Sequence, residues 1–268
     1  MTSVILGTKI HAQTLGTGPR PALAIHCAMG NSRMWRSVLS PLEDQLTTTV
    51  FDLPGHGQSG DWDRDIHAGD YQKHATQIAA SFIRRPVDII GHSFGTAAAL
   101  RIAVAAPDAV RSLTLIEPIL FKAIEGTADY ARLQADQTQL ETLIASGQDD
   151  NAVKGFIDIW GAAGMWEALT PDQRARRCAQ LPIIASASRS NLEDPGDILR
   201  PDGLESIDAP VLLIHGDKSP ASVAQVCQSL APRFQDVGTA CVPNAGHMVP
   251  ITHAQVVSDL IAMNIDRS

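Results

Sequence analysis

Basic residues are in the minority in this chain of 268 residues. It carries 21 lysines and arginines against 29 aspartates and glutamates, which leaves a formal net charge of −8. Proteins that neutralise nucleic-acid phosphates need a basic surface, so nucleic acid is not expected as a partner. With 44% hydrophobic and 19% charged residues, the composition is instead typical of a globular protein with a sizeable core.

Cysteines are few, and no two of them form a C-x-x-C pair. The four are too widely spaced to predict a disulfide framework or a zinc site: Cys27, Cys178, Cys227 and Cys241. Cys27 and Cys241 stand in apolar, strand-like runs, where a buried small side chain is the expected role. No group of histidines and carboxylates has metal-ligand spacing and no G-x-G-x-x-G motif occurs, so neither a metal nor a cofactor is expected.

Long apolar runs are absent as well. No stretch approaches the roughly 20 residues that a membrane-spanning helix needs. Residues 1–16 lack the basic start and the apolar core of a signal peptide. We therefore expect a cytoplasmic protein without a membrane partner, whose partner is a small-molecule substrate. The oligomeric state stays open, a homodimer included.

Short apolar segments alternate with helical patterns along most of the chain. Strands are predicted at residues 4–6, 10–15, 22–27, 48–52, 87–91, 113–117, 211–216 and 239–242, and helices at 34–42, 71–83, 94–105, 222–230 and 254–262. This alternation predicts an α/β fold with a mostly parallel sheet flanked by helices. In such sheets the functional site lies outside the carboxyl ends of the strands.

Residues 121–201 break this alternation, because they contain several helical patterns and no convincing strand. We interpret them as a helical lid, inserted after the sixth predicted strand into a core formed by residues 1–120 and 202–268. Apolar lid residues more often pack together than bind a ligand. Three of them are nevertheless candidates to contact substrate: Phe121, Tyr130 and Trp160. The few charges among them favour a small, largely apolar substrate.

A serine between two glycines, in the run GHSFG at 91–95, separates the predicted strand 87–91 from an alanine-rich helix. A G-x-S-x-G pattern between a strand and a helix is typical of a nucleophile elbow, in which the glycines permit a sharp turn that exposes the serine hydroxyl. Backbone N–H groups at the helix N-terminus favour a negative charge there. Outside this context, Ser93 would be interpreted as a helix cap.

A serine hydroxyl needs a base to act as a nucleophile. Among nine histidines, His247 lies on a glycine-bearing loop directly after the last predicted strand, where it can reach the elbow. His92 is expected to pack beside the serine. Four others lie in surroundings that favour solvent-facing or helix-capping roles: His11, His67, His74 and His253.

Together these motifs resemble those of α/β-hydrolases with a serine nucleophile. The resemblance covers nearly the whole chain outside the lid, and it depends on HCAMG at 26–30, FDLPGHGQS at 51–59, GHSFG at 91–95, PVLLIHGDKSP at 210–220 and NAGHMVP at 244–250. It implies acyl-transfer chemistry, with Ser93 as nucleophile and His247 as base. It also implies an oxyanion hole formed by the backbone N–H groups of Ala28 and Phe94. Neighbouring residues of these motifs are further candidates to contact substrate: His26, Met29 and Met248.

The chain departs from the family pattern at the triad acid. Most relatives carry an aspartate in G-x-x-D after the seventh strand, but GDKS at 216–219 has a serine there, which has no charge to stabilise an imidazolium. Glu117 ends the sixth predicted strand, where some members of the fold carry the acid, and its side chain is longer than that of aspartate. We favour Glu117, with Asp217 as the alternative acid. A surface carboxylate is the other role open to Glu117.

The sequence therefore predicts a hydrolase that cleaves an ester-like acyl bond, in a carboxylester, lactone or thioester, through an acyl-enzyme on Ser93. The same triad also supports C–C bond hydrolysis, perhydrolysis or a lyase reaction, so these alternatives stay open. A small-molecule receptor that keeps the hydrolase fold but turns over slowly or not at all is an alternative of a different class. An aspartate nucleophile, as in dehalogenases and epoxide hydrolases, is disfavoured by Ser93.

Overall fold

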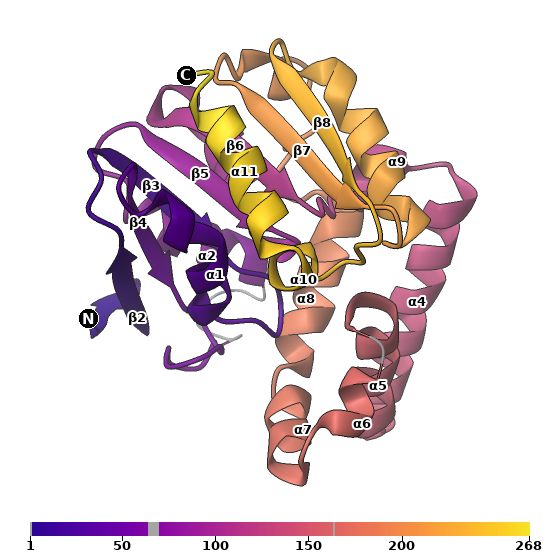
Figure 1. The fold of residues 1–268 in the computed structure, drawn as a ribbon. Helices are drawn as coiled ribbons and strands as arrows, with labels where there is room; N and C mark the ends of the chain where they lie inside the picture. The colour runs from indigo at the N-terminus through magenta and orange to yellow at the C-terminus, as the bar shows by residue number, and fades with distance from the viewer. Residues whose placement is uncertain (1, 64–69, 163) are drawn as a thin grey trace.

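The computed structural model describes residues 2–63, 70–162 and 164–268. One sheet of eight strands runs through these residues, in the order β1-β2-β4-β3-β5-β6-β7-β8 (Figure 1). The strands are β1 (Thr2–Ile5), β2 (Thr8–Leu15), β3 (Arg20–Ile25), β4 (Leu46–Phe51), β5 (Val87–His92), β6 (Val110–Ile116), β7 (Val211–Gly216) and β8 (Val237–Val242). β2 pairs antiparallel with β1 and β4, and all other neighbours pair parallel. The predicted α/β fold with a mostly parallel sheet is confirmed.

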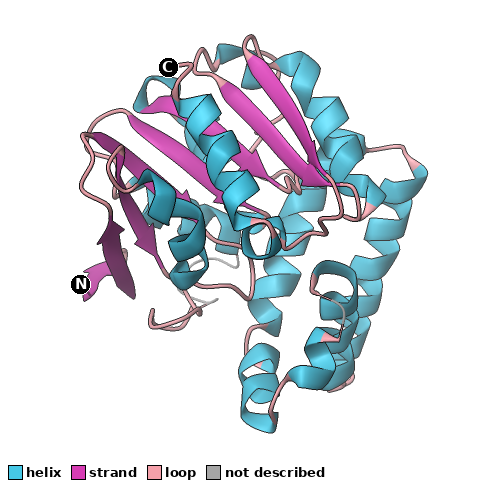
Figure 2. Cartoon of the chain, viewed as in Figure 1, coloured by secondary structure: helices cyan, strands magenta, loops and turns pink. Residues whose placement is uncertain are grey.

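Helices cover both faces of the sheet (Figures 1 and 2). One face carries α1 (Arg36–Leu39), α10 (Val249–Thr252) and α11 (Ala254–Ile265), and the other carries α2 (Tyr71–Ala80), α3 (Phe94–Ala105) and α9 (Ala221–Leu230). Because successive side chains of a strand point to opposite faces, Ala24 and Ile90 pack on the first face while Leu23 and Ile89 pack on the second. Burial on both faces explains why these strands are almost continuously apolar.

A set of helices lies between β6 and β7 in the chain: α4 (Ala128–Ala145), α5 (Asp149–Trp160), α6 (Met165–Ala168), α7 (Pro171–Cys178) and α8 (Leu181–Glu193). We call them the helical insertion. In Figure 1 they gather below the sheet. They form a small apolar core of their own, which includes Leu140, Val153 and Trp166 and which Met29 of the main fold joins. Within the described ranges, no helix has the length and apolar character to cross a membrane.

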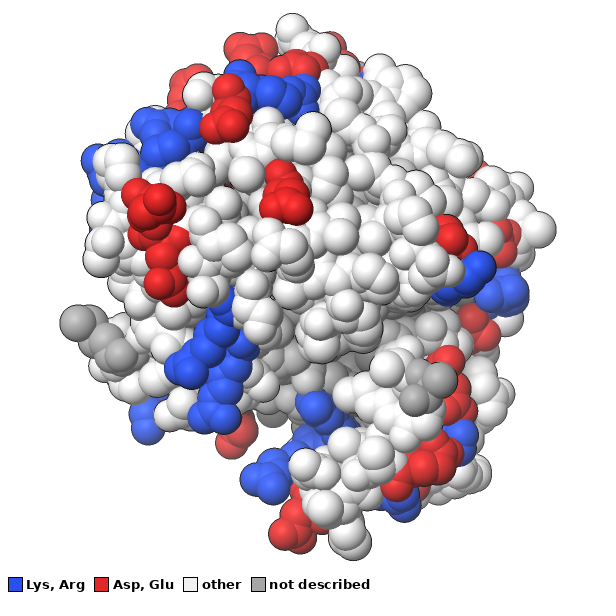
Figure 3. All heavy atoms as spheres, viewed as in Figure 1, with Lys and Arg blue, Asp and Glu red and all other residues white. Residues whose placement is uncertain are grey.

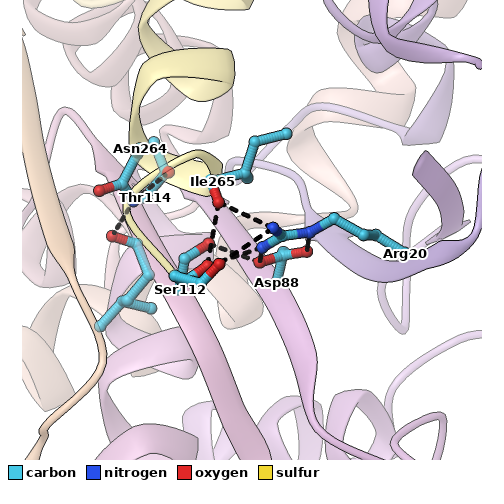
Figure 4. A network of polar contacts seen from close by, with 8 residues as sticks. Arg20, Asp88, Ser112, Thr114, Asn264 and Ile265 are labelled. Carbon is cyan, nitrogen blue, oxygen red and sulfur yellow. Dashed lines mark hydrogen bonds and ion pairs between the residues drawn. The ribbon is translucent and has the colours of Figure 1, made fainter. Parts of the chain in front are cut away.

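A polar network ties the carboxyl-terminal helix to the sheet (Figure 4). Arg20 donates two hydrogen bonds to the fully buried carboxylate of Asp88, at 2.7 and 3.1 Å, and a third to the Ile265 carbonyl at 2.8 Å. Ser112 also donates to Asp88, at 2.7 Å. Asp88 stands near the start of β5, whereas Ser93 directly follows its end. The network therefore lies at the opposite end of this strand from Ser93.

Three local expectations are wrong. The helix expected at 34–42 is reduced to the single turn α1 between two 3₁₀ turns, because Pro41 has no N–H to continue an α-helix. Cys241 is exposed, because β8 is the edge strand and its alternate side chains face solvent. His74 is buried on the inner face of α2, with its Nε2 at 3.0 Å from the Thr8 hydroxyl. His67 lies outside the described residues.

Candidate active site

Ser93 occupies a strained turn between β5 and α3. Its backbone φ of 53° and ψ of −115° lie in a region that residues other than glycine rarely adopt. Gly91 and Gly95 make the turn possible, because a Cβ on either would come within 2.6 Å and 2.1 Å, respectively, of a backbone carbonyl oxygen. The Ser93 amide donates to the Ile116 carbonyl at 2.9 Å, which fixes the turn against β6. The hydroxyl thus stands at the carboxyl end of the sheet.

The structure brings Ser93, His247 and Glu117 into one line of hydrogen bonds. His247 Nε2 lies 2.8 Å from Ser93 Oγ, and His247 Nδ1 lies 2.8 Å from Glu117 Oε2. All three residues are buried, and Glu117 is fully so. His92 donates from Nε2 to the His247 carbonyl at 2.8 Å, so the residue before the serine holds the backbone of the histidine. The arrangement has the hydroxyl, imidazole and carboxylate that nucleophilic catalysis by serine requires.

The surroundings of Glu117 explain how a carboxylate after β6 reaches His247. Glu117 has a φ of 57°, and its amide donates to the Ile214 carbonyl at 2.7 Å. Its Oε1 accepts hydrogen bonds from the Gly216 amide at 2.6 Å and from the Ser219 hydroxyl at 2.8 Å, which leaves Oε2 for the imidazole. Asp217, the alternative acid, instead lies partly exposed at 4.0 Å from the Lys218 ammonium.

Two backbone N–H groups beside Ser93 have no acceptor within the described chain, those of Ala28 and Phe94. Phe94 is the first residue of α3, where an amide has no intrahelical partner. The amide after Ala28, that of Met29, donates to His56 Nε2 at 3.0 Å, so it is already occupied. The two free amides are the expected donors of an oxyanion hole, and both residues line the cavity at Ser93.

Three histidines around the site are buried and neutral. Burial lowers the pKa of His26 to about 4 and the pKa values of His56 and His92 to about 3. His26 donates from Nδ1 to the Cys27 carbonyl at 2.7 Å and accepts at Nε2 from the Leu53 amide at 2.9 Å. It therefore links two loops, is fully buried and, in the part of the chain that the structure describes, lines neither of the two cavities that meet at Ser93, which corrects its expected contact with substrate.

Asp52 supports the same loops as these histidines. Burial alone would raise the pKa of its carboxyl, but hydrogen bonds from the backbone amides of Ser32 and Gln58 outweigh this effect and lower the pKa. The bonds measure 2.7 and 2.8 Å. They join the turn after β3 to the turn after β4, and so hold the segment that carries Ala28.

Two chambers meet at Ser93, which lines both. The first, of about 200 Å³, is lined mainly by apolar side chains, and we call it the apolar chamber; its walls include Ile119, Phe121, Leu133, Leu140, Ile159 and Ile184. The second, of about 430 Å³, is also lined mostly by apolar side chains, such as Met34, Ile157 and Met165. We call it the polar chamber because its walls include Arg33, Arg177 and His247; Asn31, Ser37 and Met248 line it as well. Four residues line both: Ala28, Ser93, Phe156 and Trp160. The Trp160 ring also packs against the His247 ring, at 4.9 Å between centroids.

Four of the five other predicted substrate contacts line a chamber. Phe121 lines the apolar chamber, and Met29 and Met248 line the polar chamber. Trp160 lines both. The prediction for Tyr130 is wrong, because this side chain is buried, lines neither chamber and donates to the Leu192 carbonyl at 3.0 Å.

Sequence reasoning missed Arg177, Ser219 and His56. Arg177 belongs to a run of three arginines on one short helix, TPDQRARRC, and no local pattern indicates which of them faces a cavity. Ser219 was noted only as a departure from the family's G-x-x-D pattern, and its hydrogen bond to Glu117 was not anticipated. His56 lies in the motif at 51–59, which indicates the family but does not reveal that its Nε2 accepts from the Met29 amide.

Comparison with known proteins agrees with this fold. Residues 22–254 match the family model of the alpha/beta hydrolase fold, and the chain belongs to this family. It is 28% identical over 252 residues to a pimeloyl-[acyl-carrier protein] methyl ester esterase of Neisseria meningitidis, covering 88% of this chain and 89% of that protein. It is 25% identical over 263 residues to a 2-(acetamidomethylene)succinate hydrolase of Mesorhizobium japonicum, covering 96% and 91%.

The solved structures give the same fold. The crystal structure of the enol-lactonase from Burkholderia xenovorans aligns with a TM-score of 0.71 at 18% identity, covering 99% of this chain and 100% of that one. At this identity the likeness establishes the fold alone. The predicted family is confirmed, and the ester-cleaving relatives support a hydrolase.

Proposed function

We propose that the protein is a serine-dependent hydrolase of an ester-like acyl bond, with Ser93 as nucleophile, His247 as base and Glu117 as acid. The observation that carries the proposal is the line of two 2.8 Å hydrogen bonds from Glu117 through His247 to Ser93. Relatives whose names denote a methyl ester esterase and a succinate-derivative hydrolase support the same class of reaction.

In the first half of the reaction, Ser93 Oγ attacks the carbonyl carbon of the substrate while His247 Nε2 takes the hydroxyl proton. The carbonyl π electrons move to oxygen, and the Ala28 and Phe94 amides stabilise this oxyanion. The intermediate then expels the leaving group, which takes the proton from His247, and an acyl-enzyme remains. Glu117 stays ionised, keeps the imidazole in the tautomer that accepts at Nε2 and stabilises the imidazolium.

In the second half, a water molecule replaces the leaving group. His247 takes one proton from the water as its oxygen attacks the acyl carbon, and the same amides stabilise the second oxyanion. The bond to Ser93 Oγ then breaks, and His247 returns the proton to the serine. We propose that the helical insertion acts as a lid, since Phe156 and Trp160 of α5 line both chambers. We also propose a cytoplasmic location, which the four free cysteines suit.

A fluorophosphonate probe combined with short-chain p-nitrophenyl esters tests the proposal. We expect stoichiometric labelling of Ser93 and a burst of p-nitrophenol, both absent in Ser93→Ala. The receptor alternative predicts the opposite, a ligand that raises the melting temperature equally in the two proteins with no turnover in either. Absence of labelling in the folded wild-type protein would also contradict the proposal.

A further inference from the structure

The two chambers differ in the charge of the side chains that line them. Among the described residues that line the apolar chamber, Asp136 is the one charged side chain. The polar chamber is lined by two arginines, Arg33 and Arg177, and by no described carboxylate. Figure 3 shows basic side chains on both sides of the hollow between the core and the helical insertion. A net-acidic protein thus presents positive charge beside Ser93.

Arg177 is half-buried without an acidic partner. Its Nη1 donates to the Met29 carbonyl and, at 3.4 Å, to Gln180 Oε1. Its Nε and Nη2 have no acceptor in the part of the chain that the structure describes, where no carboxylate lies within ion-pair distance of it. Some other partly buried arginines do have a carboxylate partner, such as Arg20 with Asp88 and Arg233 with Glu205. Burial lowers the pKa of Arg177, which reflects the unfavourable desolvation of its charge.

An arginine in this state is arranged to bind an oxyanion. Its fork of N–H groups matches the oxygens of a carboxylate or a phosphate, and an anion offsets the cost of burying the guanidinium. Arg33, on the exposed turn after β3, lines the same chamber and also lacks a carboxylate partner among the described residues. The same chamber is therefore lined by one guanidinium from the core, that of Arg33, and by one from α7, that of Arg177. Both are available to bind an anion.

The position of His247 determines which part of a substrate occupies this chamber. His247 must give its proton to the leaving group, and it lines the polar chamber but not the apolar one. The leaving group is therefore expected on the side of Arg177, and the acyl group on the side of Phe121 and Leu140. The hydrogen bond from Arg177 to the Met29 carbonyl places its guanidinium next to the loop that carries Ala28.

We propose that the substrate is an ester or thioester with an apolar acyl group and a leaving group that bears a carboxylate or phosphate, bound by Arg177 together with Arg33. This inference rests on the proposed function, because it uses the same nucleophile and base. It adds the charge of the leaving group and the direction in which the substrate lies across Ser93.

Matched aryl esters test it. The hexanoate ester of 5-hydroxy-2-nitrobenzoate is compared with the ester of the corresponding carboxamide, which has nearly the same size and no charge. We expect kcat/KM to favour the carboxylate ester by roughly 10- to 100-fold, the range for a hydrogen-bonded charged group. The preference should fall close to one in Arg177→Met and partly return in Arg177→Lys. Because Arg177 also contacts the loop that carries Ala28, a variant can slow both esters alike; the ratio of their kcat/KM values cancels this common effect.

Arg176→Met is the control, because Arg176 is exposed on the same helix and does not line either chamber. It should keep the full preference. A third ester, with a phosphate in place of the carboxylate, distinguishes the two sources of negative charge. Equal or faster turnover of the carboxamide ester by the wild type, or an unchanged preference in Arg177→Met, would overturn the inference.

A second readout keeps this test separate from that of the proposed function. Free 5-hydroxy-2-nitrobenzoate should raise the melting temperature of Ser93→Ala, and the shift should vanish when Arg177→Met is added. Turnover of neutral esters and labelling of Ser93 without any preference for the anion would contradict this inference alone. Failure of all turnover and labelling, with the melting-temperature shift intact, would contradict the hydrolase and leave the anion site standing.

Discussion

The hydroxyl of Ser219 donates a 2.8 Å hydrogen bond to Oε1 of Glu117, the carboxylate whose other oxygen contacts His247. Ser219 stands at the position of the aspartate in the family's G-x-x-D pattern, in the run GDKS at 216–219. The two residues come from neighbouring loops, after β7 and after β6. The loop after β7 thus supplies a hydroxyl, that of Ser219, and this hydroxyl orients the Glu117 carboxylate, which follows the neighbouring strand β6.

Replacing the carboxylate tests which residue is the acid. In Glu117→Gln, kcat should fall by roughly 10⁴, because an amide can favour the wrong tautomer of His247. Asp217→Asn is the control and should keep near-normal kcat, because Asp217 lies near Lys218 at the surface. Turnover of p-nitrophenyl esters measures both. The opposite pattern would move the acid to Asp217.

Removing the Ser219 hydroxyl should have a smaller effect. Ser219→Ala loses one hydrogen bond to a charged group, so kcat should fall roughly tenfold, with a shift in the pH profile of kcat as Glu117 is reoriented. Ser229→Ala, on α9, loses a hydroxyl bond of 2.6 Å to the Ala123 carbonyl, and neither residue lines the chambers at Ser93. Its kcat should be unchanged. If both variants lose activity equally, the Ser219 bond has no specific role.

His56 is expected to position the loop that carries Ala28 and Met29, and not to react itself. His56→Phe removes the acceptor of the Met29 amide while filling a similar volume. The loop that carries Ala28 would then relax, and kcat should fall roughly 10- to 100-fold with KM little changed, since an oxyanion donor acts mainly in the transition state. His253→Ala serves as the surface control. A change confined to KM would argue against this role.

Stability should fall as the pH drops from 7 to 5. Unfolding returns His26, His56 and His92 from pKa values of about 4, 3 and 3 to the ordinary value of 6.5. The unfolded chain therefore binds more protons below pH 6.5. At pH 5 each histidine should lower the unfolding free energy by about 2 kcal/mol relative to its value well above pH 6.5. The full unfolding free energy is therefore reached only above pH 6.5, where these histidines are neutral in both states.

Urea denaturation at the two pH values measures this dependence. His92→Gln, which removes one of the three titrating groups, should have a shallower dependence on pH than the wild type. A wild-type unfolding free energy that is equal at pH 7 and pH 5 would show that these histidines are not neutral in the folded protein.

The Arg20–Asp88 network should affect stability without affecting catalysis. Asp88→Asn leaves Arg20 without its buried partner and should lower the unfolding free energy by about 3 kcal/mol. Because Asp88 lies at the end of β5 away from Ser93, kcat at 25 °C should be unchanged. Asp236→Asn breaks the exposed pair with Arg267 and should cost less than about 1 kcal/mol. Equal losses in the two variants would contradict this difference.

The sequence was sufficient to predict the sheet, because its strands are short apolar runs separated by helical periodicity. It also indicated Ser93 and His247, since each lies in a glycine-bearing turn directly after a strand. It favoured Glu117 with Asp217 as the alternative acid, but it could not reveal the left-handed backbone at Glu117 or the donors from β7 and its loop that orient this carboxylate.

The chambers were beyond sequence reasoning for a different reason. The apolar residues of the insertion share the same helical periodicity whether they pack internally, as Tyr130 does, or face the cavity, as Trp160 does. Which of them face Ser93 depends on how five helices dock on the core. His26 was misjudged because a motif position does not reveal that both ring nitrogens bind backbone groups.

Phe156 and Trp160 form a partition shared by the two chambers, and both belong to α5. A smaller residue at either position enlarges the space on both sides of the nucleophile at once. A substitution at either position that admits a bulkier acyl chain would therefore also admit a wider range of alcohol or thiol leaving groups. Independent tuning of the two specificities has to come from residues that face one side alone.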